Sequence, residues 1–172
     1  MCNDKKLGGP DHFGSILDTR EWGMVHRQQE MSLQELQMAL ENHLAKMNWQ
    51  DYYPYFQRHE FECKCGCGQA EMTKKHMDIL FRARVSAGIP FHITSGFRCW
   101  LHNRSEAVGS DDSSEHPLGH GSDVRALNSW ERFIIIKSLF DAGFKRIGPN
   151  FDRLFVHCGT SPDHPQNVLF PY

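Results

Sequence analysis

The sequence predicts an α+β fold in which helices flank a small antiparallel sheet. Segments with helical and with strand periodicity are mixed along the 172 residues, without the regular βαβ alternation of a parallel sheet. The composition, with 40% hydrophobic and 23% charged residues, is that of a globular protein rather than a disordered one. This length accommodates one domain with a core and an appended arm.

The first fifty residues are predicted to form this arm, with one amphipathic helix. Ser32 and Glu35 have the spacing of a capping box at a helix start. Apolar residues then recur at helical spacing: Leu33, Leu36, Leu40, Leu44 and Met47. We therefore expect a helix over about 33–47 within an arm over 1–50, whose role the sequence does not assign. The main domain is expected over 51–172.

Two helices are predicted in the main domain. The first runs from the N-cap candidate Thr73 to about Ala87, with Gly88 as its stop. The second covers about 130–142, with Asn128 and Glu131 as its start signal and Gly143 as its end. Because the second contains so many large apolar residues, we expect it to pack into the core rather than lie at the surface.

Four short strands complete the predicted sheet. Runs of apolar or alternating residues mark them at 91–95, 123–126, 153–158 and 168–170. Since these strands do not alternate regularly with the helices, we expect them to pair in an antiparallel manner.

Charge and hydropathy exclude two classes of partner. The net charge is −2, and no run of Lys and Arg exceeds two residues, which argues against broad binding to a nucleic-acid backbone. No segment approaches the ~18 apolar residues of a membrane span, and the N-terminus lacks a secretory apolar region. We expect synthesis in the cytoplasm without a signal peptide. The oligomeric state is not indicated.

Metal-binding residue types are concentrated in the stretch SEHPLGHGSD, residues 114–123. His116 and Asp123 lie seven residues apart, and glycines between them let the backbone turn tightly. His157, within an apolar strand, could supply a third ligand. Two histidines and one carboxylate leave a fourth position for water, as in catalytic zinc sites. Solvated loop histidines and a hydrogen-bonded core histidine remain the alternative from spacing alone.

Four motifs follow one another over about residues 55–172. They are Ser95-Gly96-Phe97-Arg98-Cys99, His102-Asn103, Ser114-x-His116-x-x-Gly119-x-Gly121-x-Asp123 and Phe155-Val156-His157. Together they resemble the zinc D-alanyl-D-alanine carboxypeptidase family, whose relatives include bacteriophage endolysins and cell-wall peptidases of the hedgehog-like fold. The resemblance implies this fold and one catalytic Zn²⁺ held by His116, Asp123 and His157. It also implies hydrolysis of peptide bonds in peptidoglycan stem peptides or cross-links. With synthesis in the cytoplasm, the protein is expected to act on the cell wall after a phage-type release.

The resemblance also implies roles for Arg98 and Ser114. Arg98 would face the zinc and bind a substrate carboxylate or the oxyanion, a task for which lysine is a poor replacement. Ser114 is expected to contact the substrate or to steady the ligand loop by a hydrogen bond. A surface arginine and a simple turn serine are the alternatives.

The chain departs from the family pattern beside the last ligand. Leu154 stands where relatives carry a glutamate, and Gly159 where many carry an aspartate. A zinc hydrolase usually needs a general base near the metal. We predict Asp152 for this role, with Asp163 and His164 as alternatives. Without such a base, the chain would be a zinc-containing module that binds wall peptides, which is our alternative to a carboxypeptidase or an endopeptidase such as an endolysin.

Cysteines form a separate group whose chemistry the sequence leaves open. Cys63, Cys65, Cys67 and Cys99 could be buried free thiols, a second metal site or a disulfide pair. We favour buried thiols, because the Cys-x-Cys-x-Cys spacing is not the Cys-x₂-Cys of ordinary zinc ribbons. Cys158 should point away from the neighbouring zinc ligand and into the core, since side chains alternate along a strand.

Overall fold

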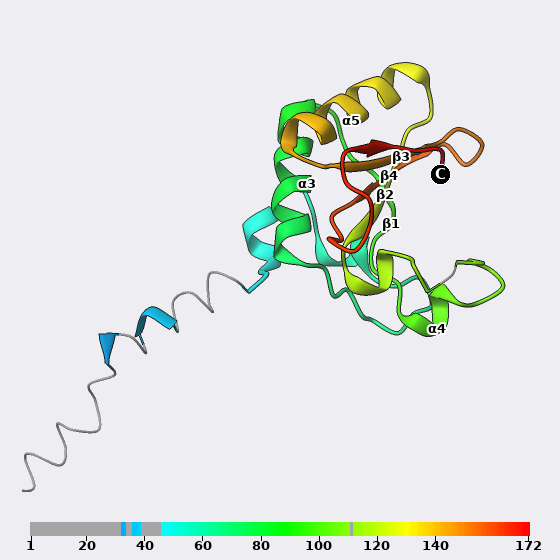
Figure 1. Ribbon diagram of the computed structural model, residues 1–172. Helices are drawn as coiled ribbons and strands as arrows, with labels where there is room; N and C mark the ends of the chain where they lie inside the picture. The colour runs from blue at the N-terminus through cyan, green and yellow to red at the C-terminus, as the bar shows by residue number, and fades with distance from the viewer. Residues whose placement is uncertain (1–31, 34–35, 39–45, 111) are drawn as a thin grey trace, which may run out of the picture. The chain divides into compact units, whose positions relative to one another are not determined.

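The structure, a computed structural model, describes residues 32–33, 36–38, 46–110 and 112–172. The chain divides into two units, Met1–His43 and Leu44–Tyr172, and the second contains every strand in the described ranges (Figure 1). The predicted helix over 33–47 lies largely outside the described residues. Leu33 and residues 36–38 are helical. The division into an arm over 1–50 and a domain over 51–172 stays a prediction.

Five strands form one sheet, and with the helices they confirm the α+β fold class. The strand order is β1-β2-β4-β3-β5, and all neighbours are antiparallel except β3 and β5. The strands are β1 (Ile93–Ser95), β2 (Gly121–Arg125), β3 (Arg146–Asn150), β4 (Phe155–Gly159) and β5 (Val168–Leu169).

Two longer helices, α3 (Lys74–Ala87) and α5 (Ser129–Ala142), begin and end at the predicted caps. The side chains of Thr73 and Asn128 accept backbone N–H groups at the helix starts. Gly88 and Gly143 end them in the left-handed conformation, which favours glycine.

The described residues also form shorter helical elements. They are α4 (Trp100–Asn103) and three 3₁₀ helices, η1 (Trp49–Tyr52), η2 (Arg58–Phe61) and η3 (His116–Leu118). Within the described ranges, no helix has both the length and the hydrophobicity needed to cross a membrane.

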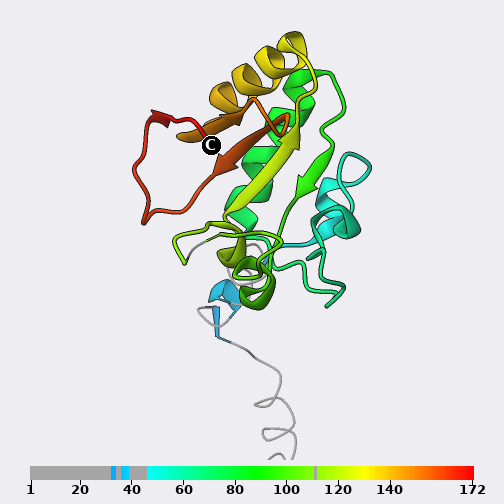
Figure 2. The same ribbon diagram turned by 90° about the vertical axis from the view of Figure 1, so that its right-hand side faces the viewer.

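The two faces of the sheet carry different side chains. Val124 and Val156 pair across β2 and β4 and belong to the buried core, on the face where α3 and α5 lie (Figure 2). Asp123 and His157 are the neighbouring pair in the same register. Because alternate strand residues point to opposite faces, this polar pair lies on the other face. Cys158 is buried in the core, as predicted.

The prediction for α5 was only half right. Ile135 and Leu139 are buried in the core, but Phe133 and Phe140 are 64% and 71% exposed. The physical reason is geometric: α3 and the sheet cover one side of α5, so apolar residues on its other side remain at the surface.

Strand β3 was not predicted, because Gly148 and Pro149 are poor strand formers. Gly148 has a packing role there, since a Cβ at this position would lie 2.7 Å from the Phe170 ring. The aromatic C-terminal segment can therefore lie close to the sheet only where β3 lacks a side chain.

The favoured interpretation of the cysteines as buried thiols is wrong for two of them. Cys63 is buried, but Cys65 and Cys67 are exposed and Cys99 is half-buried. The reason is that residues 63–69 form a surface loop, closed by a backbone hydrogen bond from Cys63 to Gln69 and turned by two glycines with positive φ.

Candidate metal centre

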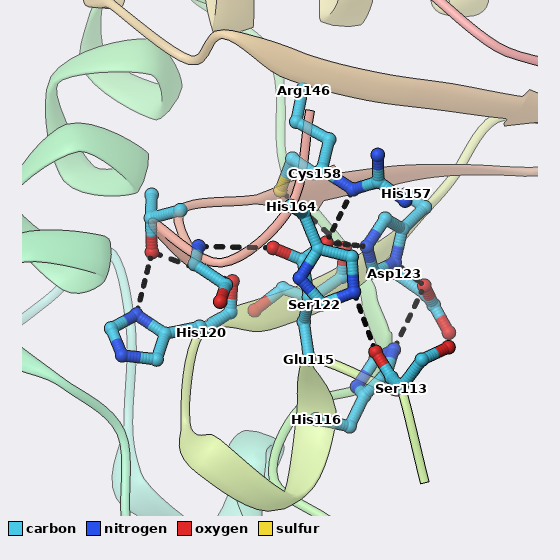
Figure 3. A network of polar contacts seen from close by, with 12 residues as sticks. Ser113, Glu115, His116, His120, Ser122, Asp123, Arg146, His157, Cys158 and His164 are labelled. Atoms are coloured by element: carbon cyan, nitrogen blue, oxygen red, sulfur yellow. Dashed lines mark hydrogen bonds and ion pairs between the residues drawn. The ribbon is translucent and has the colours of Figure 1, made fainter. Parts of the chain in front are cut away.

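The three predicted ligands come together in the structure. The candidate donor atoms of His116, Asp123 and His157 all lie within 4.8 Å of one another. Oδ1 of Asp123 is 2.8 Å from Nδ1 of His157 and 3.4 Å from Nε2 of His116 (Figure 3). All three side chains are buried. Asp123 is the third residue of β2 rather than its first, and strand pairing places it directly opposite His157.

Each imidazole has one nitrogen hydrogen-bonded to a group other than Asp123. Nδ1 of His116 donates to the carbonyl oxygen of Gly96 at 2.6 Å. Nε2 of His157 donates to Oε2 of Glu115 at 3.1 Å. These bonds orient the two rings so that Nε2 of His116 and Nδ1 of His157 face Asp123, and Nδ1 of His157 also bonds Oδ1 of Asp123. Nε2 of His116 is buried without a hydrogen-bond partner among the described residues. This nitrogen is therefore available as a ligand to a metal ion.

The charge states of His116 and Asp123 suit metal ligation. Burial would lower the pKa of His157, but its bonds to Asp123 and Glu115 outweigh burial and raise it, so metal binding there would release a proton. Burial lowers the pKa of His116, which favours the neutral imidazole that a metal requires. Burial by itself would raise the pKa of Asp123, but the adjacent His116 and His157 outweigh this and hold it below its usual range. Arg98 also donates to Oδ2 of Asp123 at 2.8 Å. Asp123 is therefore an ionised carboxylate whose two oxygens face different partners.

Sequence reasoning missed Glu115, a buried carboxylate that contacts a predicted ligand. Its Oε2 accepts from His157 and from Nε of Arg146 at 3.0 Å, and its Oε1 accepts from the N–H of Ser161 at 3.0 Å. Burial would raise the pKa of Glu115, but its bond to His157 and the nearby charges outweigh burial and lower it to about 2. Glu115 is thus fully engaged and ionised.

A glycine makes the position of Glu115 possible. A Cβ on Gly159 would lie 2.0 Å from Oε2 of Glu115, so the carboxylate fills the space of a side chain at residue 159. The sequence carried only a weak signal for this arrangement: an acid next to His116, and a glycine two residues after His157 where many relatives have an acid.

A cavity of about 740 Å³ opens beside two of the donors, Asp123 and His157. Asp123, His157, Arg98 and Ser114 are among its lining residues. Arg98 follows β1 and is held by its Nε, which donates to Oγ of Ser95 at 2.8 Å. The hydroxyl of Ser114 has no hydrogen-bond partner among the described residues, so it does not steady the ligand loop in the way we expected. Its predicted contact with substrate stays a prediction.

The candidate bases lie in different surroundings. Asp152 is exposed in the turn between β3 and β4 and is not among the residues that line the cavity. Asp163 is also exposed. His164 does line the cavity, and its Nε2 donates to the carbonyl of Ser113 at 2.6 Å. This bond leaves Nδ1 of His164 as an acceptor that has no partner among the described residues.

Comparison with known proteins agrees with the geometry. A family model described as Peptidase M15 matches residues 54–159, more than half of the chain. The matched range contains all three donors, Arg98 and Glu115. None of the curated proteins compared with the chain matches it. M15 peptidases depend on zinc, which suits the two imidazoles and one carboxylate gathered here. The chain therefore belongs to the M15 family of metallopeptidases.

Proposed function

We propose that this protein is a zinc peptidase that hydrolyses peptide bonds in peptidoglycan stem peptides or cross-links. The observation that carries the proposal is the convergence of His116, Asp123 and His157 beside a cavity, with one nitrogen of each imidazole already hydrogen-bonded. Zinc held by these residues would supply an activated water and polarise the carbonyl of the scissile bond.

The charge of the cavity supports a substrate that carries a carboxylate. Of its cationic lining residues, Arg98 pairs with Asp123 and Arg146 pairs with Glu115. Lys64 and Arg153 line the same cavity and form no ion pair with a carboxylate of the described residues. Two positive charges are thus available to a peptide's C-terminal carboxylate. Such an anchor favours cleavage next to a free C-terminus, which is carboxypeptidase action.

Arg98 serves the same reaction by holding Asp123. Its planar guanidinium bonds Ser95 through Nε and Asp123 through a terminal nitrogen, both at 2.8 Å. A lysine has a single nitrogen and cannot reproduce both contacts from one fixed plane. Because Arg98 also lines the cavity, it is placed to contact substrate as well.

We assign the proton-accepting role to His164 rather than to Asp152. His164 lines the cavity with its tautomer fixed and Nδ1 unpaired, whereas Asp152 lies outside the lining. His164→Gln should lower kcat by about a hundredfold, within the usual range for general-base catalysis, with little change in KM. The matched variant Asp152→Asn should leave both constants unchanged. The reverse pattern would return the role to Asp152.

The proposed function is tested on isolated peptidoglycan. Purified protein should release new amino groups, and both a chelator and the Asp123→Ala substitution should abolish the release. Mass analysis of the products separates a single released amino acid, expected for a carboxypeptidase, from an internal cut, which would replace it by an endopeptidase. Binding to the wall without any release would overturn the peptidase proposal in favour of a binding module.

A matched pair of synthetic stem peptides tests the carboxylate anchor. The peptide with a free C-terminus should be cleaved more efficiently than its C-terminal amide. Lys64→Ala and Arg153→Ala should each raise KM for the free acid and leave KM for the amide unchanged. Equal cleavage of both peptides would contradict the anchor.

A further inference from the structure

A second group of potential metal ligands is separate from His116, Asp123 and His157, which are here named the strand donors because two of them lie on β2 and β4. The sulfur atoms of Cys63, Cys65, Cys67 and Cys99 all lie within 4.8 Å of one another. The first three come from the loop before α3, and Cys99 immediately precedes α4. We propose that these four cysteines, here named the cysteine cluster, bind one zinc ion that holds the two segments together.

The spacing of the sulfurs fits a tetrahedral ion. A Zn–S bond of about 2.3 Å places two sulfurs of a tetrahedron about 3.8 Å apart. Sγ of Cys63 is 3.4 Å from Sγ of Cys65 and 3.8 Å from that of Cys99. Cys65 and Cys99 are 3.7 Å apart. Three of the sulfurs therefore already form one face of such a tetrahedron, and Cys67 lies close enough to complete it.

Hydrogen-bond donors point at these sulfurs, as they do around thiolate ligands. The N–H of Cys99 donates to Sγ of Cys63 at 3.3 Å, and the N–H of His102 donates to Sγ of Cys99 at 3.4 Å. Nδ1 of His102 lies 3.2 Å from Sγ of Cys63. Donors of this kind stabilise the negative sulfur and orient it toward a metal.

The exposure of the cluster disfavours a purely apolar role. A buried cysteine acts as a small hydrophobic residue, but Cys65 and Cys67 are exposed and contribute little to a core. Four sulfur ligands in tetrahedral proximity are typical of zinc or of an iron–sulfur centre. Zinc is the simpler assignment, because one mononuclear ion accounts for all four sulfurs.

The position of the cysteine cluster indicates which parts of the chain this zinc ion would hold together. Lys64 lies between two of the cysteines and lines the cavity, while Arg98 precedes Cys99 and contacts Asp123. An ion at the cluster would fasten the loop of Lys64 to the segment of Arg98. The cysteine cluster would thus brace one wall of the substrate cavity without touching the reacting atoms.

Zinc counting on the full chain tests the proposal. The wild-type protein should retain two zinc ions after dialysis against metal-free buffer. The Cys65→Ser/Cys67→Ser variant, which alters only exposed side chains of the cluster, should retain one. His116→Ala should also retain one, at the other site. Cys158→Ala removes a thiol outside the cluster and should retain two.

Cobalt substitution identifies which site is lost. Thiolate-to-cobalt charge-transfer absorption should appear in the wild-type and His116→Ala proteins and vanish in the Cys65→Ser/Cys67→Ser variant. Its absence from the wild-type protein would overturn the proposal, as would bound iron with inorganic sulfide. Titration of fewer than six thiols in the unfolded, metal-free protein, which has six cysteines, would point to a disulfide instead. Because His116→Ala keeps the absorption while losing hydrolysis, this proposal and the proposed function fail separately.

Discussion

The strand donors and the cysteine cluster are built on different kinds of backbone. His116, Asp123 and His157 are buried, and two of them sit opposite each other on paired strands. The cysteine cluster uses a surface loop and the residue before a short helix, and two of its members are exposed. The sheet thus positions Asp123 and His157, and the short helix η3 positions His116, whereas residues 64–69 of the cysteine loop are exposed. A metal ion at the strand donors should therefore serve catalysis, whereas one at the cysteine cluster should stabilise the fold of its loop.

The largest expected effect comes from removing a strand donor. His116→Ala should lose zinc from that site and lower kcat/KM by at least a thousandfold, since losing about 4 kcal/mol of metal assistance has that result. Far-UV circular dichroism should stay near wild type, because strand pairing rather than zinc holds the sheet. The exposed histidine variant His92→Ala is the control. If the zinc-free protein unfolds, zinc at the strand donors also stabilises the fold.

A smaller effect should follow acidification, through a buried histidine beneath the strand donors. His76 bonds Oγ of Ser122 at 2.8 Å and Oγ1 of Thr160 at 3.2 Å. Burial lowers the pKa of His76 to about 3. The unfolded chain binds this proton below about pH 6.5 and the folded protein does not, so folding stability falls as the pH drops through that window. The contribution of His76 to the free energy of unfolding should therefore decrease by about 2 kcal/mol between pH 7 and pH 5.

Urea unfolding with excess chelator measures this contribution. The wild-type protein should lose about 2 kcal/mol more stability between the two pH values than His76→Gln does, while the exposed variant His92→Gln should match the wild type. If the free energy of unfolding changes with pH by the same amount in wild type and His76→Gln, protonation of His76 does not contribute to the pH dependence of stability.

The smallest effect concerns the carboxylate that orients His157. Glu115→Ala should weaken zinc binding at the strand donors by about tenfold, at the lower end of the range for such supporting residues. Gly159→Asp should weaken it too, because the new side chain would enter the space of the Glu115 carboxylate. The double variant moves the carboxylate from residue 115 to residue 159 and should recover affinity.

The cycle is read from zinc affinities, with the exposed variant Glu106→Gln as control. Recovery in the double variant gives a coupling energy between the two positions. Simple addition of the two losses would show that Glu115 acts through packing rather than by orienting His157.

Local signals explain which elements could be predicted. Thr73, Gly88, Asn128 and Gly143 act on their own helix ends, so α3 and α5 were located from the chain alone. Strand β3 carries no such signal, because its Gly148 is explained only by the ring of Phe170. The exposed side of α5 was missed for a similar reason, since its apolar pattern does not say how much of the helix its neighbours cover.

The family was predictable from motifs that follow one another in order, and the family match over residues 54–159 confirms it. The three side chains named from those motifs also converge in the structure. The part played by Glu115 was not predictable, because it depends on the empty space at Gly159. Likewise, the spacing of Cys63, Cys65 and Cys67 gave little reason to group them with Cys99, which the fold brings within reach.

By itself, the sequence determined the fold class, the limits of the two main helices and the types of side chain that could hold a metal. Only the tertiary structure decided which nitrogen of each imidazole faces Asp123, which carboxylate orients His157 and which cysteines lie together. The physical reason is the separation along the chain over which each effect acts. Capping and periodicity act within a few residues. The distances between donor atoms depend instead on the register of β2 against β4 and on contacts between segments far apart in the sequence.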